Sequence, residues 1–255
     1  MGQALQEITS LTAAENFPSA RVVFTMGGKG GCGKSSFASM LTEWYKSKGI
    51  DIGLVDMDSE NKAQGSLQHF FGEARKTNIQ RSRGLDDFLD MIDGGATIVV
   101  ADQGSGSGEV SARWFDSLYE PSRNAGIAFT AVGLVGPDPA TVSSVLAWGQ
   151  FLQRRVDYLI VKNAITEPAD FGYWETDREA EKFRAAFHPQ EIAMEFRLPE
   201  IENEAREAGL TMHAVAERRA KGNALLSSTA SVFRAQAYRR HLFAELDRVK
   251  GLLVL

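Results

Sequence analysis

The chain has 255 residues, of which 44% are hydrophobic and 24% are charged, and its formal net charge is −5. This composition suits one soluble α/β domain with a sizeable core, and the acidic balance excludes a globally basic surface, so nucleic acid would need a local patch. The single cysteine, Cys32, excludes an intrachain disulfide and argues against an iron–sulfur cluster held by cysteine pairs, in agreement with a cytoplasmic protein.

Residues 1–20 are expected to form an N-terminal extension, followed by a single domain over residues 21–255. The extension lacks the basic start and the apolar centre of a secretory signal, and Ala4–Leu11 gives a weak helix signal. No stretch approaches the roughly 18–20 consecutive apolar residues that a membrane span needs, so we do not expect a transmembrane segment.

The stretch RVVFTMGGKGGCGKSS at residues 21–36 opens the domain. A strand-prone run over Val22–Met26 leads into a glycine-rich turn, and a helix is expected to begin at Lys34. The turn fits the phosphate-binding pattern G-x-x-x-x-G-K-[ST], with Gly28 and Gly33 as its fixed glycines. Backbone N–H groups in such a turn form a nest for phosphate oxygens at the positive end of a helix.

This pattern gives the side chains of the turn distinct roles. The Lys34 ammonium should reach the β- and γ-phosphates, and the Ser35 hydroxyl should bind Mg²⁺. The predicted phosphate-binding residues are Gly28, Gly30, Gly31, Cys32, Gly33, Lys34, Ser35 and Ser36.

Acidic residues follow two later strands. A helix over residues 34–48 leads to a buried strand over residues 50–55, which ends in Asp56 and Asp58. Two carboxylates beside a phosphate loop are site candidates, although both could simply cap a strand-end turn. The next strand, residues 97–101, ends at Asp102 in the Walker B arrangement, in which the carboxylate holds Mg²⁺ through water opposite the serine of the P-loop.

Three further segments lie near these strands. Residues 73–83 are expected to form a solvated loop, with a contact surface for a partner or a phosphate as the alternative. Residues 59–72 are interpreted as a first switch-like segment, and the glycine-rich residues 103–108 as a second switch that responds to the γ-phosphate.

Strands and helices alternate through the rest of the chain. We expect helices at residues 109–119, 141–155, 175–187 and 228–250, and strands at residues 127–135, 156–161 and 192–197. The fold class is therefore α/β, with a mostly parallel twisted sheet, helices on both faces and the ligand at the carboxyl ends of the strands. Asn163 follows the fifth strand and could be an ordinary cap.

One residue inside the P-loop makes the motif more specific. Lys29 begins the sequence KGGCGKS, which resembles the deviant Walker A motif KGGxGK[ST] of the ParA/MinD family of ATPases. This resemblance implies a P-loop NTPase fold that binds ATP and Mg²⁺ and hydrolyses ATP slowly, under partner stimulation, to ADP and phosphate. It also implies an ATP-sandwich homodimer in which Lys29 reaches the phosphates of the partner subunit.

The resemblance extends to residues after the other strands. It implies that Asp58 orients the attacking water and that Asp56 supports Mg²⁺, its waters or a P-loop lysine. It further implies that Asn163 reads the adenine edge and that the backbone near Pro199 lines the adenine pocket. The chain departs from the family after Asp58 and after Asp102, where Ser-Glu-Asn-Lys and Gln-Gly-Ser-Gly stand in place of the usual Pro-Gln-Gly-Asn and Thr-Pro.

The C-terminal part holds two further patterns. Basic residues form two clusters, which in small partition relatives would imply DNA binding without sequence preference and otherwise form a solvated face: Arg218, Arg219 and Lys221, then Arg234, Arg239 and Arg240. Apolar residues at helical spacing predict a terminal helix packed on the sheet, with a membrane-docking amphipathic tail as the alternative: Leu242, Leu246, Val249 and Leu253.

The leading hypothesis is an ATP-dependent switch in DNA or plasmid partition or in conjugative transfer, acting with an unidentified adaptor or ATPase-stimulating protein. The alternatives are an ATP-dependent small-molecule ligase or synthetase of the same fold, and a MinD-like membrane-positioning ATPase. Membrane binding is the least expected of these.

Overall fold

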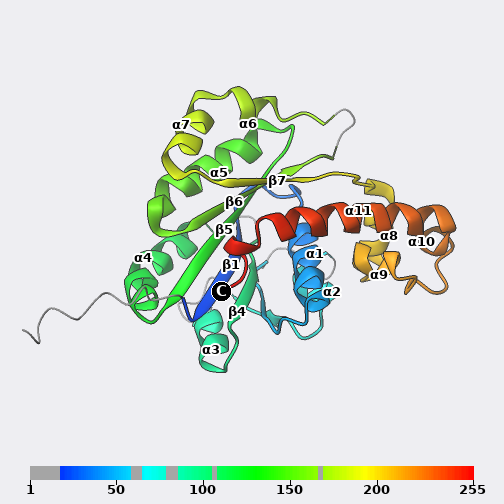
Figure 1. Ribbon diagram of the computed structural model, residues 1–255, viewed down its shortest axis with the longest axis horizontal. Helices are drawn as coiled ribbons and strands as arrows, with labels where there is room; N and C mark the ends of the chain where they lie inside the picture. Colours follow the sequence, from blue (N-terminus) through cyan, green and yellow to red (C-terminus); the bar gives the residue numbers. More distant parts are fainter. Residues whose placement is uncertain (1–17, 59–64, 79–85, 105–107, 166–168) are drawn as a thin grey trace, which may run out of the picture.

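The computed structural model describes residues 18–58, 65–78, 86–104, 108–165 and 169–255 (Figure 1). The expected helix signal at residues 4–11 lies outside these ranges. Parts of both proposed switch segments, residues 59–64 and 105–107, and most of the polar stretch after residue 78 also lie outside them.

A seven-stranded sheet, parallel throughout, forms the centre of the described chain. The strands in spatial order are β3 (Arg75–Lys76), β2 (Gly53–Asp56), β4 (Ile98–Asp102), β1 (Ala20–Met26), β5 (Ile127–Val135), β6 (Asp157–Asn163) and β7 (Gln190–Met194). The order places β1 in the middle, so the P-loop that follows it lies at the centre of the carboxyl edge.

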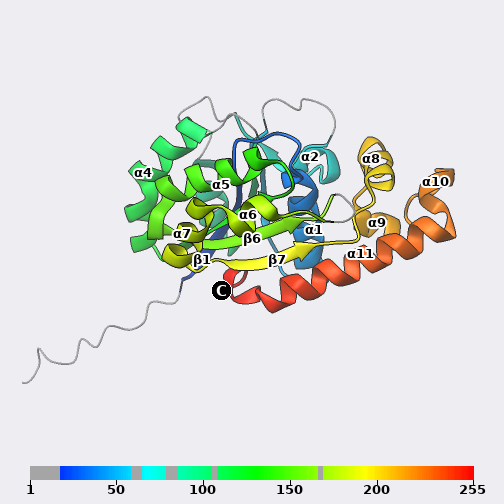
Figure 2. The same ribbon diagram turned by 90° about the horizontal axis from the view of Figure 1, so that it is seen from above.

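Helices cover both faces of the sheet, as the parallel arrangement requires. On one face the helical core consists of α1 (Lys34–Ser47), α2 (Leu67–Phe70), α8 (Pro199–Glu207), α9 (Met212–Ala216), α10 (Ala224–Ser227) and α11 (Thr229–Arg248). On the other face lie α3 (Asp87–Asp93), α4 (Gly108–Asn124), α5 (Pro139–Leu152), α6 (Gly172–Thr176) and α7 (Arg178–Phe187). Figure 2 shows α8–α10 and the start of α11 projecting to one end of the molecule.

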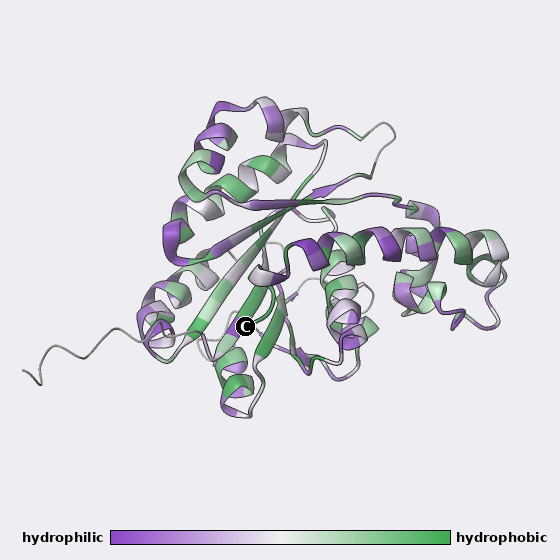
Figure 3. Cartoon of the chain, viewed as in Figure 1, coloured by the Kyte–Doolittle hydropathy of each residue, from purple (hydrophilic) through white to green (hydrophobic). Residues whose placement is uncertain are grey.

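Alternation along the strands divides the apolar residues between two cores. In β1, Val23 packs with α1 and α11, whereas Val22 and Phe24 pack on the opposite face with α4 and α5. Figure 3 shows the hydrophobic strands in the interior and the hydrophilic residues on the outer helices. The fold class predicted from the sequence is thus confirmed.

Several elements differ from the sequence-based expectation. The helix expected over residues 175–187 is interrupted, because the Asp177 side chain accepts hydrogen bonds from the N–H groups of Glu179 and Ala180 and starts a new helix. The last strand ends at Met194 rather than residue 197, because its partner β6 ends at Asn163. The segment after Pro199 forms helices, beginning with proline at the first turn of α8.

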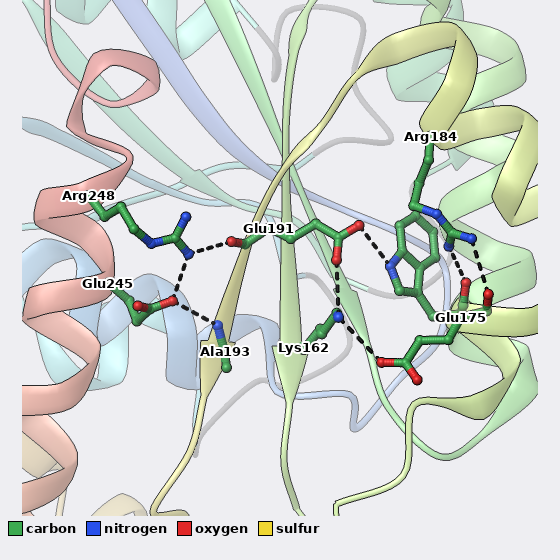
Figure 4. A network of polar contacts seen from close by, with 8 residues as sticks. Lys162, Glu175, Arg184, Glu191, Ala193, Glu245 and Arg248 are labelled. Atoms are coloured by element: carbon green, nitrogen blue, oxygen red, sulfur yellow. Dashed lines mark hydrogen bonds and ion pairs between the residues drawn. The ribbon is translucent and has the colours of Figure 1, made fainter.

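The edge strand β7 is screened by side chains of its neighbours (Figure 4). On the α11 side, Arg248 donates to the Glu191 carbonyl at 2.6 Å, and Glu245 accepts from the Ala193 N–H at 3.3 Å. On the other side, the Glu191 carboxylate pairs with Lys162 at 3.1 Å and accepts from Trp174 at 3.1 Å. The two contacts on the α11 side occupy backbone groups that would otherwise be open for pairing with another strand.

The C-terminal helix is a packed element. Leu242 and Leu246 of α11, and Val249 and Leu253 just after it, are each at most 3% exposed, so the membrane-docking interpretation of this segment is wrong. The Tyr45 hydroxyl on α1 donates to the Leu253 carbonyl at 2.5 Å, which fixes the end of the segment. Among the described residues, no helix has both the length and the apolar character to cross a lipid bilayer.

Candidate nucleotide-binding site

A cleft of about 870 Å³ opens at the carboxyl ends of the strands. One part of it is lined by the P-loop, the start of α1 and the residues after β2 and β4: Gly30, Gly31, Gly33, Lys34, Ser35, Ser36, Asp58, Gln103 and Gly104. The other part extends along α1 between α2 and α8, past Asn163, Arg197, Pro199, Arg206 and Met212. Most of the site residues predicted from the sequence therefore meet in one hollow.

The P-loop has the backbone that its glycines predict. Gly27, Gly31 and Gly33 have φ values of +112°, +73° and +97°, in the region that favours glycine. A Cβ on Gly33 would lie 2.6 Å from the Asn163 side chain, so this position has no room for another residue. Lys34, at the start of α1, is buried, and its ammonium donates to the Lys29 carbonyl at 2.8 Å.

Lys29 points toward α5. Its ammonium pairs with Asp138 at 3.0 Å, and both side chains are about half exposed. Asp138 also caps α5 by accepting from the Ala140 N–H at 2.9 Å; this hydrogen bond and Lys29 lower the pKa of Asp138. In addition, the Gly28 N–H donates to the Ser144 hydroxyl on α5. The first part of the P-loop is therefore tied to the start of this helix.

Asp102 has the environment of a cation ligand. The side chain is fully buried, and one carboxylate oxygen accepts from the Thr25 hydroxyl at 3.0 Å. The other oxygen, Oδ2, has no hydrogen-bond partner among the described residues. Burial raises the pKa of Asp102 to about 6, a rise that the nearby Ser35 hydroxyl opposes. A buried carboxylate with one unsatisfied oxygen beside a serine hydroxyl fits Mg²⁺.

The rest of a magnesium shell would have to come from a ligand. Within the described ranges, no group of three or more His, Cys, Asp or Glu side chains could hold a metal ion. Mg²⁺ usually keeps several waters and binds to one or two carboxylates together with substrate phosphates. The donor set therefore suits a cation that arrives with a nucleotide.

Asp56 and Asp58 have different surroundings. Asp56 is fully buried, and its carboxylate accepts from the Asp58 N–H and Lys76 ammonium at 3.0 Å each and from the Gln68 N–H at 2.9 Å. These contacts make it an anchor that shapes the end of β2. Asp58 lines the cleft, and a Cβ on Gly104 would lie 2.8 Å from its Oδ1. The two segments after β2 and β4 thus meet in close contact.

Comparison with known proteins identifies a similar fold among solved structures. No protein-family model and no curated protein sequence matches the chain. The septum site-determining protein MinD complexed with Mg-ADP from Pyrococcus horikoshii matches with a TM-score of 0.53 and 14% identity, over 92% of this chain and 99% of that chain. The chain has a ParA/MinD-like fold.

Two further solved structures match less well. MinD from Aquifex aeolicus has a TM-score of 0.47 and 14% identity, with 89% of this chain and 98% of that chain covered. A ParA family ATPase from Chlorobium tepidum also has a TM-score of 0.47 and 14% identity, with 83% and 98% covered.

In this ParA/MinD-like fold, Asn163 lies behind the P-loop and is nearly inaccessible. Its amide nitrogen donates to the Cys32 carbonyl at 2.8 Å, and its oxygen accepts from Arg197. Arg197 in turn forms a two-pronged ion pair with Glu202 of α8, including an Nε–Oε1 hydrogen bond of 2.6 Å. We call Asn163, Arg197 and Glu202 the α8 brace. The amide that was predicted to read adenine thus already has two partners within the chain.

Several residues of the site carried no recognisable signal in the sequence. Arg197 and Glu202 act only because the segment after β7 brings them next to Asn163 at the end of β6, and Thr25 lies inside a strand. Lys76 belongs to the stretch that was expected to be a solvated loop, yet its ammonium contacts buried Asp56.

The two basic clusters come together at the projecting end of the ParA/MinD-like fold. α9 and α11 pack side by side, and Arg239 of α11 pairs with Glu217, next to Arg218 and Arg219. Arg218, Arg219, Lys221, Arg234 and Arg240 are exposed. The exposed aromatic Phe233 lies in the same region of α11.

Proposed function

We propose that the protein is an ATP-dependent molecular switch that binds ATP with Mg²⁺, dimerises around the nucleotide and hydrolyses it slowly. The observation that carries this proposal is the convergence of the P-loop and Asp58 on one cleft, with the buried Asp102 carboxylate beside Ser35, which lines that cleft. The likeness of the fold to MinD complexed with Mg-ADP supports the nucleotide class.

Each group has a distinct task in this scheme. The P-loop N–H groups and the start of α1 bind phosphate oxygens, and Lys34 exchanges the Lys29 carbonyl for the β- and γ-phosphates. Ser35 and Asp102 would hold Mg²⁺, which supplies charge neutralisation on the phosphates when bound. Asp58, which lines the cleft, positions the attacking water. Asp56 accepts a hydrogen bond from the Asp58 N–H and so fixes the segment that carries Asp58.

The base would lie toward the other part of the cleft. Pro199 and the α8 brace line this side, next to the P-loop. Because the chain already engages the amide of Asn163, adenine contact by this residue would require exchange of one of its two partners.

Lys29 supplies the link to dimerisation. Its ammonium is about half exposed and is held by a single ion pair with an equally exposed partner, which contributes little stability. The side chain can therefore leave Asp138 at small cost and reach the phosphates of a second subunit.

The cargo that we propose is duplex DNA or a DNA-bound complex, as in plasmid partition or conjugative transfer, with an adaptor that stimulates hydrolysis. The exposed basic residues of α9–α11 support this role, because they form one patch in a chain that is acidic overall. A face-to-face dimer would present two such patches.

The test is solution mass by light scattering with ADP and with ATP. We expect the native chain to be monomeric with ADP, and Asp58→Ala to form a lasting dimer with ATP that Lys29→Ala abolishes. Lys182→Ala, which removes an exposed lysine on α7, should leave the dimer intact. A monomer in every nucleotide state, with ATP bound, would instead favour the small-molecule ligase, whose substrate site would be the part of the cleft between α2 and α8.

A further inference from the structure

One buried hydroxyl in the wall of the nucleotide cleft has no partner. Tyr238 of α11 lines the cleft and is 1% exposed, and its hydroxyl forms no hydrogen bond with a described residue. A buried polar atom in this state destabilises the fold, because folding removes it from bulk water without supplying a protein partner. Native proteins contain few such atoms, so this one calls for an explanation.

The hydroxyl lies on the side of the cleft that holds the α8 brace. Burial raises the pKa of Tyr238, Arg197 opposes this rise and Glu202 adds to it, so both charged groups lie within electrostatic reach of the hydroxyl. Asn163 and Pro199 line the same part of the cleft, where we place the base. Because its pKa is raised, the hydroxyl stays protonated at neutral pH and can both donate and accept a hydrogen bond.

The other buried polar side chains in this part of the cleft are already engaged. The three members of the α8 brace bond to one another and to the P-loop. The Ser39 hydroxyl on α1 donates to the Ser36 carbonyl at 2.8 Å, and the Thr211 hydroxyl donates to Glu43 at 2.7 Å. Tyr238 can therefore bind a ligand group without giving up a hydrogen bond to any described residue.

Apolar side chains surround the same part of the cleft. They come from α1, α8, the turn after α8 and the start of α9: Met40, Pro199, Ala205, Leu210 and Met212. A planar aromatic ring fits such walls, because thioether and aliphatic groups pack favourably on its faces. A purine also carries hydrogen-bond donors and acceptors along its edge. Apolar walls with one uncommitted polar group therefore match a purine base.

We infer that the Tyr238 hydroxyl binds the edge of the purine base of ATP, in the role that the family resemblance implies for Asn163. This inference rests on the nucleotide function proposed above. Asn163 then keeps both of its partners when the nucleotide binds, so the P-loop and α8 stay joined through the brace. The new hydrogen bond adds to affinity, because no hydrogen bond within the described chain is broken to form it.

The experiment compares the full native chain with Tyr238→Phe, which removes only the hydroxyl. In calorimetric titrations with Mg²⁺ present, we expect the affinity for ATP to fall about 5- to 10-fold, since one neutral hydrogen bond is lost. Inorganic tripolyphosphate, which has no base, should bind both chains equally. The thermal midpoint of the nucleotide-free variant should rise, because an unpartnered buried hydroxyl is gone. Tyr173→Phe is the matched control, because it removes the same group from an exposed tyrosine on α6.

The outcomes separate this inference from the proposed function. If the native chain binds neither ATP nor tripolyphosphate, the proposed function fails and the inference fails with it. If the native chain binds ATP but Tyr238→Phe binds it equally well, the inference alone is overturned. An equal loss of affinity for ATP and tripolyphosphate would also overturn it, since the base would then not be involved. A lower thermal midpoint of the nucleotide-free variant would show that the hydroxyl supports the fold, and would overturn the inference as well.

Discussion

At the scale of single residues, the contact between Gly104 and Asp58 is the most restrictive feature of the cleft. A Cβ at position 104 would lie 2.8 Å from Asp58 Oδ1 and 2.9 Å from its Cα, so a side chain there must displace the residue proposed to position water. We expect Gly104→Ala to lower ATP turnover on the order of 10- to 100-fold, because misplacement by about 1 Å is this costly.

Nucleotide affinity should change far less in this variant, since the P-loop is untouched. Gly72→Ala is the control, because nothing lies within 4 Å of a Cβ at that exposed turn. Steady-state phosphate release and ATP affinity, measured on both variants, test whether turnover falls while nucleotide binding is kept. Unchanged turnover in Gly104→Ala would remove Asp58 from the proposed mechanism.

The residues of this site were predictable to different degrees. The P-loop, Asp58 and Asp102 follow from short motifs in which spacing along the chain sets spacing in the fold. The Asp56–Lys76 contact and the Arg197–Glu202 pair depend on how distant segments fold back, and neither pair has a local pattern. The sequence therefore predicts the residues that would bind phosphate, but not the side-chain pairs that fix the segments around the cleft.

At the scale of elements, the α8 brace joins one helix to the back of the P-loop. The Arg197 and Glu202 side chains are 8% and 10% exposed, so Glu202→Gln would leave a buried guanidinium without its counter-charge. We expect the variant to lose about 3 kcal/mol of unfolding free energy and to bind ATP more weakly, because Asn163 loses its support.

Urea unfolding and nucleotide titration of Glu202→Gln test this expectation. Glu200→Gln is the control, because this glutamate lies in the same first turn of α8 but is exposed. A loss of stability shared by both variants would point to helix α8 itself, through its N-terminal charges, rather than to the brace.

Among the elements, the long strands were predictable because each is a continuous apolar run in a sheet covered on both faces. The edge strand β3 was not, since it consists of Arg75 and Lys76 and exists only through its pairing with β2. α8 and α9 were missed for other reasons: only Ile201 and Ala205 of α8 are buried, and α9 is five residues long, too short to show a helical period.

At the scale of the whole molecule, the basic patch on α9–α11 should make DNA binding depend on salt. We expect Arg219→Gln, Lys221→Gln and Arg234→Gln together to weaken binding to duplexes of unrelated sequence alike. The slope of log affinity against log salt should become shallower by about one for each phosphate that the variant no longer neutralises. Fluorescence anisotropy on the ATP-bound Asp58→Ala chain measures this, from about 50 to about 200 mM salt.

A double variant on α7, Arg178→Gln with Lys182→Gln, removes two exposed basic side chains and serves as the control for surface charge, with effects compared per charge removed. An equal effect of both sets would assign the attraction to net charge. Binding that is absent in every state, with dimerisation intact, would direct the search for cargo to a protein partner.

The hydrogen bond between Tyr45 and the carbonyl of Leu253 joins groups that are 208 residues apart in the chain. Trp44, beside Tyr45, likewise donates to Asp247 of the last helix. A chain leaving the ribosome therefore carries this aromatic pair without its partners until residues 247–253 have been made. The hydrophobic core on this face of the sheet can be completed only after α11 has emerged. A stalled or truncated chain would expose hydrophobic surface to chaperones and proteases.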